Sequence, residues 1–421
     1  MKKIFAAMSI ALLATPALAQ SGTNSPYSMY GIGVLSDQGN SFNRGMNGVG
    51  VGLRPHNQIN YLNPASYSAV DSLSFIFDAG LSLQMTNFKE GKVSKNANNA
   101  NFEYAVGGFR LARNLGVGFG LLPVSNIGYN FAKTETVVEG DFATTSLYYG
   151  SGGLHEVFLG LGWSPFSGFS LGVNGGYLWG EIDRKVTNSY IIKSQYCNVS
   201  SYKLDFGMQY QQKLNSKDVL TIGATYGLGH SLKADPTSSV ISLRQINSQT
   251  TKADTTTYVA KDALDFPTQI SAGVAYTHGN KWTVGVDYTL QQWAEAKYPE
   301  DKGNSYVASK NAYKDQHRVN AGLEYCQNPE GRSFMSRIRY RLGASYSTPY
   351  LKINGQDGPN QISVSAGVGI PIVNGFNNRS ILNISGQWVR NEATGLIKEN
   401  TFRINVGFTF NERWFAKWKF E

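Results

Sequence analysis

Cysteine and histidine are scarce in this chain, and their scarcity excludes several kinds of site. The 421 residues include two cysteines, Cys197 and Cys326, and five histidines, which are His56, His155, His230, His278 and His317. These residues are too scattered in sequence to form a metal-binding motif. None of the histidines is placed convincingly beside an inward-facing serine. The sequence therefore indicates no metal, no cofactor and no enzymatic activity.

One short motif has the form that a catalytic serine would need. Gly168-Phe169-Ser170-Leu171-Gly172 matches the Gly-x-Ser-x-Gly pattern. That pattern works as a nucleophile only on a strained strand-to-helix turn. Here it opens a predicted strand, with Ser170 between apolar neighbours. We therefore assign Ser170 a structural role.

Long apolar runs are missing too. The longest, residues 4–13, is shorter than the roughly 20 residues that a membrane-spanning helix needs. Lys2 and Lys3 precede it and Ala17-Leu18-Ala19 follows, which is the order of a signal peptide cleaved near Ala19. Residue 20 is Gln, so lipoprotein processing is not expected. The sequence predicts a secreted chain without a helical anchor.

The basic excess does not point to nucleic acid. The formal net charge is +9, but no basic cluster interleaves with aromatic residues. Basic groups at the two ends of a membrane protein would instead contact anionic outer-membrane lipid and lipopolysaccharide. We expect those lipids as partners, and no nucleic acid.

Alternation of apolar and polar residues is abundant. Near the C-terminus, every second residue from Phe402 to Phe410 is large and apolar, and the residues between are polar or small. Successive side chains of a strand point to opposite faces. A chain that repeats this pattern without a helical period is typical of a membrane barrel, with lipid outside and a polar lumen. The predicted fold class is all-β: a transmembrane antiparallel β-barrel of about 14 strands with an N-terminal hatch or plug segment.

The predicted strands also give a topology. They cover residues 72–88, 101–113, 115–131, 153–163, 168–183, 201–213, 218–232, 266–278, 281–293, 315–327, 334–346, 361–372, 380–390 and 401–410. Linkers alternate between short and long, and residues 233–265 form the longest. Short turns of such barrels face the periplasm. We therefore expect a signal peptide at 1–19, a hatch at 20–71, the barrel at 72–410, and at 411–421 an aromatic, basic tail at the periplasmic membrane surface or on a partner.

This topology separates the two cysteines. Cys197 falls in the third outer loop and Cys326 at the periplasmic end of a strand. A hydrocarbon core is roughly 30 Å thick, whereas bridged Cα atoms lie about 4.4–6.8 Å apart. The sequence predicts that both cysteines are unpaired.

The same alternation turns charged side chains inward. On the strand predicted at 334–346, Ile338, Tyr340, Leu342 and Ala344 are expected to face lipid, so the residues between them point inward. With the same alternation on the preceding strand, the charged side chains expected in the lumen are Arg318, Glu324, Arg337, Arg339 and Arg341. Glu324 is expected to lie near Arg337. One interpretation is a charged conduit or a site for a ligand head group. The other is a salt-bridged filling that stiffens the wall, because an arginine facing lipid at mid-membrane costs about 2–4 kcal/mol and must turn inward whatever the function.

Residues 20–71 do not follow the barrel pattern. They are rich in glycine and contain Asn63-Pro64-Ala65. Asn at an N-cap with Pro at the first helical position is a sound helix start. We expect Asn63, Pro64 and Ala65 to begin a short helix in a segment of the right size to plug the lumen.

These motifs resemble a known family. Gly45-Met46-Asn47-Gly48-Val49-Gly50-Val51, then Tyr61-Leu62-Asn63-Pro64-Ala65, then the first strand, is similar to the FadL/TodX-like outer-membrane transport family, PorV-like relatives included. The resemblance implies a hatch and lateral release of apolar cargo beside a kinked third strand. Here that strand contains Leu121-Leu122-Pro123-Val124-Ser125-Asn126. Because proline lacks a ladder donor, we expect Pro123, Ser125 and Asn126 to border a lateral opening.

Two functions remain open at this point. The first is passive uptake of hydrophobic small molecules, such as long-chain fatty acids or hydrocarbons, across a bacterial outer membrane. The second is a FadL-like barrel that acts as a partner in protein secretion or outer-membrane assembly, as the resemblance to PorV-like barrels implies. A continuous lumen would favour the first, and a sealed lumen the second.

Overall fold

The computed structural model describes residues 22–136, 143–247, 250–303, 305–374 and 377–413. The predicted signal peptide and residues 414–421 of the predicted tail lie outside the described residues. No helix within the described ranges is long and apolar enough to cross a membrane.

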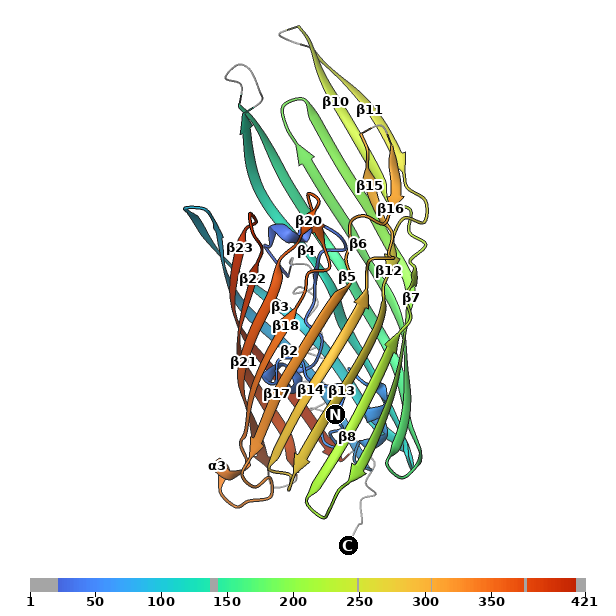
Figure 1. Ribbon diagram of the computed structural model, residues 1–421, viewed down its shortest axis with the longest axis vertical. Helices are drawn as coiled ribbons and strands as arrows, with labels where there is room; N and C mark the ends of the chain where they lie inside the picture. The colour runs from blue at the N-terminus through green and yellow to red at the C-terminus, as the bar shows by residue number, and fades with distance from the viewer. Residues whose placement is uncertain (1–21, 137–142, 248–249, 304, 375–376, 414–421) are drawn as a thin grey trace.

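Fourteen long strands form a closed antiparallel barrel (Figure 1). Closure comes from the first and last strands, which pair from Ser74↔Arg413 to Lys89↔Lys398. The predicted fold class and strand number are confirmed. The strands are β2 (Ser74–Glu90), β3 (Val93–Ala112), β4 (Leu115–Thr136), β5 (Ala143–Phe166), β6 (Phe169–Thr187), β7 (Ile191–Lys213), β8 (Asp218–Gly227), β13 (Thr268–His278), β14 (Trp282–Gln292), β17 (Gln316–Cys326), β18 (Arg339–Ser347), β21 (Asn360–Asn374), β22 (Asn377–Glu392) and β23 (Lys398–Arg413).

The barrel is apolar outside and polar inside. On β23, Phe402 and Val406 are exposed on the outer surface while Asn405 and Thr409 are buried. The same alternation gives Leu81 and Leu83 on β2 an outward position. An apolar outer face is what a lipid solvent requires of a barrel strand.

The longest predicted linker is itself mostly strand. β10 (Thr237–Asn247) and β11 (Thr250–Val259) form a hairpin that projects beyond the barrel wall (Figure 1). β10 also pairs with the upper part of β7. Three small sheets lie in the loops, and each is a pair of short strands: β9 (His230–Ser231) with β12 (Asp265–Phe266), β15 (Tyr298–Asp301) with β16 (Tyr306–Ser309), and β19 (Lys352–Ile353) with β20 (Gln356–Asp357).

The N-terminal segment, defined here as residues 22–71, lies inside the barrel (Figure 1). It contains η2 (Pro26–Met29), β1 (Val34–Leu35), α2 (Ser41–Gly45) and η3 (Pro64–Ala69). α2 lies against β21, β22 and β23, whereas η3 lies against β4, β5, β6 and β7. Most of its side chains are buried.

One predicted strand begins too early. Phe334–Arg337 is a short helix, α3, in the turn between β17 and β18, and β18 starts at Arg339. Arg337 and Ile338 are therefore not part of the ladder, and Ile338 is buried instead of facing lipid. The alternation seen in the sequence extended through a turn, where it has no structural meaning.

The prediction for the cysteines is confirmed, because Cys197 and Cys326 are both free. Cys326 ends β17 as expected. Cys197, however, lies within β7 and not in a loop. The strand is longer than its apolar pattern indicated because it continues beyond the lipid-facing zone.

Glycines on the inner wall let the N-terminal segment approach the strands closely. A Cβ atom added at Gly172 would lie 2.3 Å from the carbonyl carbon of Pro64, and one at Gly223 would lie 2.0 Å from the main-chain oxygen of Val51. Neither contact can be relieved by rotating a flexible side chain. Glycines at these positions of the wall therefore leave room for the backbone of the N-terminal segment.

We predict that Gly172→Ala displaces η3 and destabilises the protein by about 1–3 kcal/mol, the usual effect of overpacking. The measurement is limited trypsin digestion, which should cut faster at Arg44 and Arg54 in the variant. Gly175→Ala on the same strand is the control, since the atom nearest to its Cβ would be Leu204 Cδ2, at 3.8 Å. Equal digestion of the two variants would contradict the close packing.

Candidate functional site

The backbone ladder between β3 and β4 is incomplete. The two strands pair only from Ala105↔Leu121 to Ala112↔Leu115, although β3 extends back to Val93 and β4 on to Thr136. Over the unpaired lengths, β3 remains bonded to β2, and β4 to β5. We call this the ladder break.

Both strands bulge where they separate. In β4 the register with β5 passes from Pro123↔His155 to Ser125↔Leu154, so Val124 is an extra residue. In β3 the register with β2 skips Glu103. Bulges bend a strand and end pairing, and they explain why β3 and β4 diverge at this level.

The N-terminal segment bonds to the open edge of β4. β1 pairs with it antiparallel, Val34↔Asn126 and Leu35↔Ser125. The Ser36 amide donates to the Val124 oxygen at 3.0 Å, and Gln38 Nε2 donates to the Pro123 oxygen at 3.3 Å. β1 and its neighbours therefore take the place of β3 and satisfy carbonyls that a wall strand would otherwise pair.

The start of the segment lies between the two separated strands. A Cβ at Gly22 would lie 2.7 Å from Asn126 Oδ1 of β4 and 3.4 Å from Asn101 Oδ1 of β3. The Gly22 oxygen accepts from Gln84 Nε2 at 3.1 Å. Both edges of the ladder break thus contact the N-terminal segment.

Asp37 fastens this part of the segment to two strands of the wall, β23 and β17. Its carboxylate lies 2.6 Å from Arg403 Nη1 and 3.8 Å from Arg318 Nη1, and its main-chain oxygen accepts from Arg44 Nη2 at 2.6 Å. Burial raises the pKa of the carboxyl, but the guanidinium groups of Arg403, Arg318 and Arg44 outweigh it and hold that pKa below its usual range. Arg44 in turn pairs with Glu103 at 2.8 Å.

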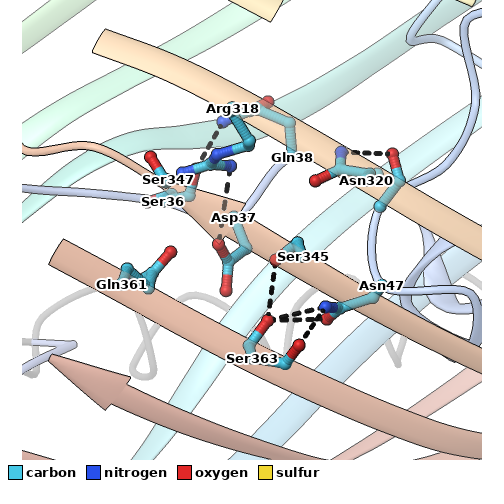
Figure 2. Close-up of polar contacts among 12 residues, drawn as sticks. Ser36, Asp37, Gln38, Asn47, Arg318, Asn320, Ser345, Ser347, Gln361 and Ser363 are labelled. Atoms are coloured by element: carbon cyan, nitrogen blue, oxygen red, sulfur yellow. Dashed lines mark hydrogen bonds and ion pairs between the residues drawn. The ribbon is translucent and has the colours of Figure 1, made fainter. Parts of the chain in front are cut away.

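A polar cavity lies on the other side of the segment, against β13, β14, β17 and β18. It has a volume of about 790 Å³, counting space open to solvent, and Asp37, Asp287, Arg318 and Asn320 are among its lining residues. Figure 2 shows Asp37 facing Arg318 and Asn47 reaching Ser363, whose Oγ accepts from Asn47 Nδ2 at 2.7 Å. This half of the interior suits water and not apolar cargo.

The side nearest β4 is apolar. Leu122 belongs to a buried cluster with Tyr61, Tyr67, Tyr104 and Phe158. Val124, Ile127 and Tyr129 of the same strand belong to a second cluster at the loop-rich end of the barrel, together with Leu154, Leu178, Trp293, Tyr313 and Tyr350. β4 therefore carries buried apolar side chains from the loop-rich end down to the ladder break.

The predicted residues of the lateral opening meet at the ladder break. Pro123 and Ser125 are buried, and Ser125 Oγ accepts from the Leu154 amide at 3.3 Å. Asn126 donates to Ser36 Oγ at 2.9 Å. The sequence pattern does not single out Ser36, Asp37, Gln38 or Glu103, because no motif marks them. Their importance arises from contacts with residues distant in sequence.

The predicted helix start is confirmed. Asn63 is the N-cap of η3, its Oδ1 accepts from the Ala65 amide at 3.2 Å, and Pro64 occupies the first turn. The helix is of the 3-10 type. Asn63 Nδ2 donates to the oxygens of Val51 and Met208, so this motif ties the segment to β7, apart from the ladder break.

Arg339 and Arg341 form a pair inside the barrel wall, and Arg337, which was also predicted to point inward from this strand, does not join them. Glu324 binds Arg339 Nη1 at 2.5 Å and Arg341 Nε at 2.6 Å. The prediction that Glu324 lies near Arg337 is wrong, because α3 places Arg337 in the turn. Arg341 also donates to Asn383 Oδ1 at 2.6 Å, and this network lies apart from Arg318. Within the described ranges, no three His, Cys, Asp or Glu side chains gather to hold a metal ion.

These features define a membrane-spanning β-barrel of the FadL/TodX-like type, and solved structures share that fold. The Pseudomonas putida toluene transporter TodX matches with a TM-score of 0.60 and 14% identity, over 91% of this chain and 100% of its own. The Ralstonia pickettii toluene transporter TbuX matches with a TM-score of 0.58 and 12% identity, over 89% and 98%. A Pseudomonas aeruginosa FadL homologue matches with a TM-score of 0.59 and 11% identity, over 90% and 99%.

The chain belongs to the BamG family, whose model matches residues 1–421. No curated protein matches the sequence. At 11–14% identity the solved structures establish the fold alone.

We predict that Asp37→Asn loosens the N-terminal segment, because the guanidinium groups of Arg403 and Arg318 lose their shared carboxylate. The expected loss of unfolding free energy is about 3 kcal/mol, the low end for removing one member of a buried pair, since 22% of the Asp37 side chain is exposed. Urea unfolding in detergent micelles measures it.

Glu295→Gln is the control for that variant, since its partner Lys310 is at the surface and 83% of the Glu295 side chain is exposed. We expect no measurable change there, as is usual for surface pairs. If the urea concentration at the unfolding midpoint is the same for Asp37→Asn as for the unmodified chain, Asp37 does not fasten the segment.

Proposed function

We propose that this protein is an outer-membrane channel for passive uptake of hydrophobic small molecules, with long-chain fatty acids or hydrocarbons as substrates. The N-terminal segment acts as the plug, and cargo leaves sideways through the ladder break into the bilayer. The observation that carries the proposal is that β3 and β4 separate above Ala105↔Leu121 and that β1 takes the vacated edge. TodX and TbuX are toluene transporters, which supports the substrate class.

The distribution of polarity inside the barrel supports a sideways path. Apolar cargo gains about 25 cal/mol per Å² on leaving water. The cavity beside Arg318 and Asn320 is lined by polar groups, so apolar cargo would not gain this free energy there. The inner side of β4 offers Leu122, Val124 and Ile127 instead, next to the ladder break.

Release requires β1 to leave β4. The contacts that hold it there are few: two residue pairs in the ladder, the Ser36 amide, the Gln38 amide group and the hydrogen bond from Asn126 to the Ser36 hydroxyl. An antiparallel pair of two residues is much weaker than the long ladders of the wall. β1 is thus the most easily detached neighbour of β4.

The test is to lock β1 in place. Leu35 and Ser125 are directly opposed, and opposed residues of antiparallel strands have Cβ atoms about 4.5–5.5 Å apart, near disulfide range. We expect the Leu35→Cys, Ser125→Cys chain to lose uptake of a labelled long-chain fatty acid and of toluene when oxidised. Uptake should return with reductant.

Two controls accompany this experiment. Each single cysteine variant should transport normally under both conditions. A Thr277→Cys, Thr283→Cys chain places a bridge between β13 and β14, where the two hydroxyl oxygens are 3.2 Å apart, and should transport whether oxidised or reduced. Full uptake by the oxidised β1–β4 chain would overturn lateral release.

The partner role is a second candidate, and one observation favours it. At the loop-rich end, Trp293, Tyr313 and Tyr350 pack into one buried cluster, with Trp293 5.1 Å from Tyr313 and 4.9 Å from Tyr350 between ring centroids. A buried aromatic cluster at this end is what a sealed lumen would require. A secretion or outer-membrane assembly defect on deletion, together with unchanged lipid uptake, would favour this candidate.

A further inference from the structure

One arginine joins the two edges of the ladder break. Arg44 on α2 is 2% exposed, and its Nη2 lies 2.8 Å from Glu103 Oε2 on β3. Its Nε donates to the Gly39 oxygen at 2.9 Å, and its Nη2 also donates to the Asp37 oxygen at 2.6 Å. Residues 37–39 adjoin the stretch that is bonded to β4. Arg44 therefore connects that stretch to the free edge of β3.

The bulge in β3 supplies the carboxylate for this contact. In the pairing with β2, Phe102 and Tyr104 have partners and Glu103 has none. A bulge re-aims a side chain relative to the regular pattern of the strand. Glu103 is 7% exposed, and its second carboxylate oxygen accepts from the Ser82 hydroxyl. Both oxygens of the carboxylate are therefore bonded to buried groups.

The residue after the bulge also binds α2. The Tyr104 hydroxyl oxygen accepts from the Ser41 amide at 2.8 Å and lies 2.8 Å from Asp78 Oδ1 of β2. Asn40 Nδ2 donates to the other oxygen of Asp78 at 3.1 Å. Strands β2 and β3 thus hold the start of α2, next to the contact between Arg44 and Glu103.

The two sides of the N-terminal segment differ in the kind of contact. On the β4 side, the contacts described above are hydrogen bonds between neutral groups. On the β3 side, a buried ion pair adds to the hydrogen bonds. Separating a buried ion pair leaves charges without partners in a region of low dielectric, which is less favourable than separating neutral hydrogen bonds. The β4 side is therefore the weaker of the two.

We propose that Arg44 is a positioning residue for the lateral opening: it keeps residues 37–45 on β3 while β1 leaves β4. The opening then forms at one seam, between β1 and β4. The N-terminal segment stays in the lumen during release, so the barrel does not open to polar solutes. The inference rests on the proposed release through the ladder break and deepens it, because it names the residue that decides which side of the segment opens.

The experiment compares two buried serines, one on each side of the segment. Ser125 on β4 is 0% exposed and is paired with β1, whereas Ser41 on α2 is 3% exposed and contacts Tyr104 of β3. Each serine is replaced singly by cysteine in the full-length chain that also carries Cys197→Ser and Cys326→Ser. The rate of reaction with methyl methanethiosulfonate is measured in a nonionic detergent. Each rate is divided by the rate for the same thiol in the urea-unfolded chain.

A buried thiol reacts only when local opening exposes it, so its rate follows the population of the open state. Because the β3 side holds the buried ion pair, we expect Ser125→Cys to react at least about tenfold faster than Ser41→Cys. Equal rates, or a faster reaction of Ser41→Cys, would overturn this inference and leave the proposed uptake standing. That comparison keeps Arg44 and Glu103 unchanged, so it does not depend on the folding of a destabilised variant.

A further substitution assigns the difference in rate to the ion pair. Glu103→Gln removes the charge on β3 and leaves Arg44 its bonds to the Asp37 and Gly39 oxygens. In that background, Ser41→Cys should react at a rate within about threefold of Ser125→Cys, because a neutral amide holds the guanidinium less strongly. Heat-modifiable migration on gels reports barrel assembly in each case.

Glu324→Gln is the matched control. It makes the same change at another buried carboxylate, which binds Arg339 and Arg341 and lies apart from the ladder break. The ratio of the two rates should stay as in the chain that keeps Glu324. A ratio that survives Glu103→Gln, or that falls equally in Glu324→Gln, would overturn the positioning role. Full protection of both thiols, even with toluene added, would overturn lateral release and this inference together.

Discussion

Backbone hydrogen bonding is the constraint on which the rest of this structure depends. Hydrocarbon offers no partner for an N–H or C=O group, so a barrel crossing it must pair every strand edge. The ladder break between β3 and β4 violates that rule in the wall itself. The protein restores it from inside, where Val34, Leu35 and Ser36 supply the partners that β3 does not. The N-terminal segment is therefore a part of the wall as well as a filling of the lumen.

That double role explains how the charged groups are arranged. Asp37 lies one residue beyond the Ser36–Val124 bond, and its ion pairs with Arg403 and Arg318 hold the bonded stretch against β23 and β17. Glu103, the bulged residue of β3, binds Arg44 of α2. Glu324 instead binds two arginines of the barrel wall, Arg339 and Arg341. The interior charges thus act mainly as fasteners, which is the salt-bridged interpretation of the alternation.

Much of the architecture follows from the sequence because it depends on local patterns. Period-two alternation on segments such as 401–410 reports a face toward lipid, and that signal predicted fourteen strands and the polar interior. Asn63-Pro64 predicted a helix start because capping involves neighbours in sequence. The same signal failed at Phe334–Arg337, where alternation continued by chance through a turn, and at Cys197, where β7 extends above the lipid and no longer needs to alternate.

The candidate site was only partly predictable. Pro123 marked the right strand, since a missing N–H is a property of one residue. The partners that occupy the break, Ser36 and Gln38, and the fastening residue Asp37 carry no local pattern, because their contacts span some 85 residues of chain or more. The sequence by itself determined a barrel with an apolar outside, a polar inside and a weak point at Pro123. Only the tertiary structure decided that the N-terminal segment closes that weak point, since this depends on which distant residues the closed sheet brings together.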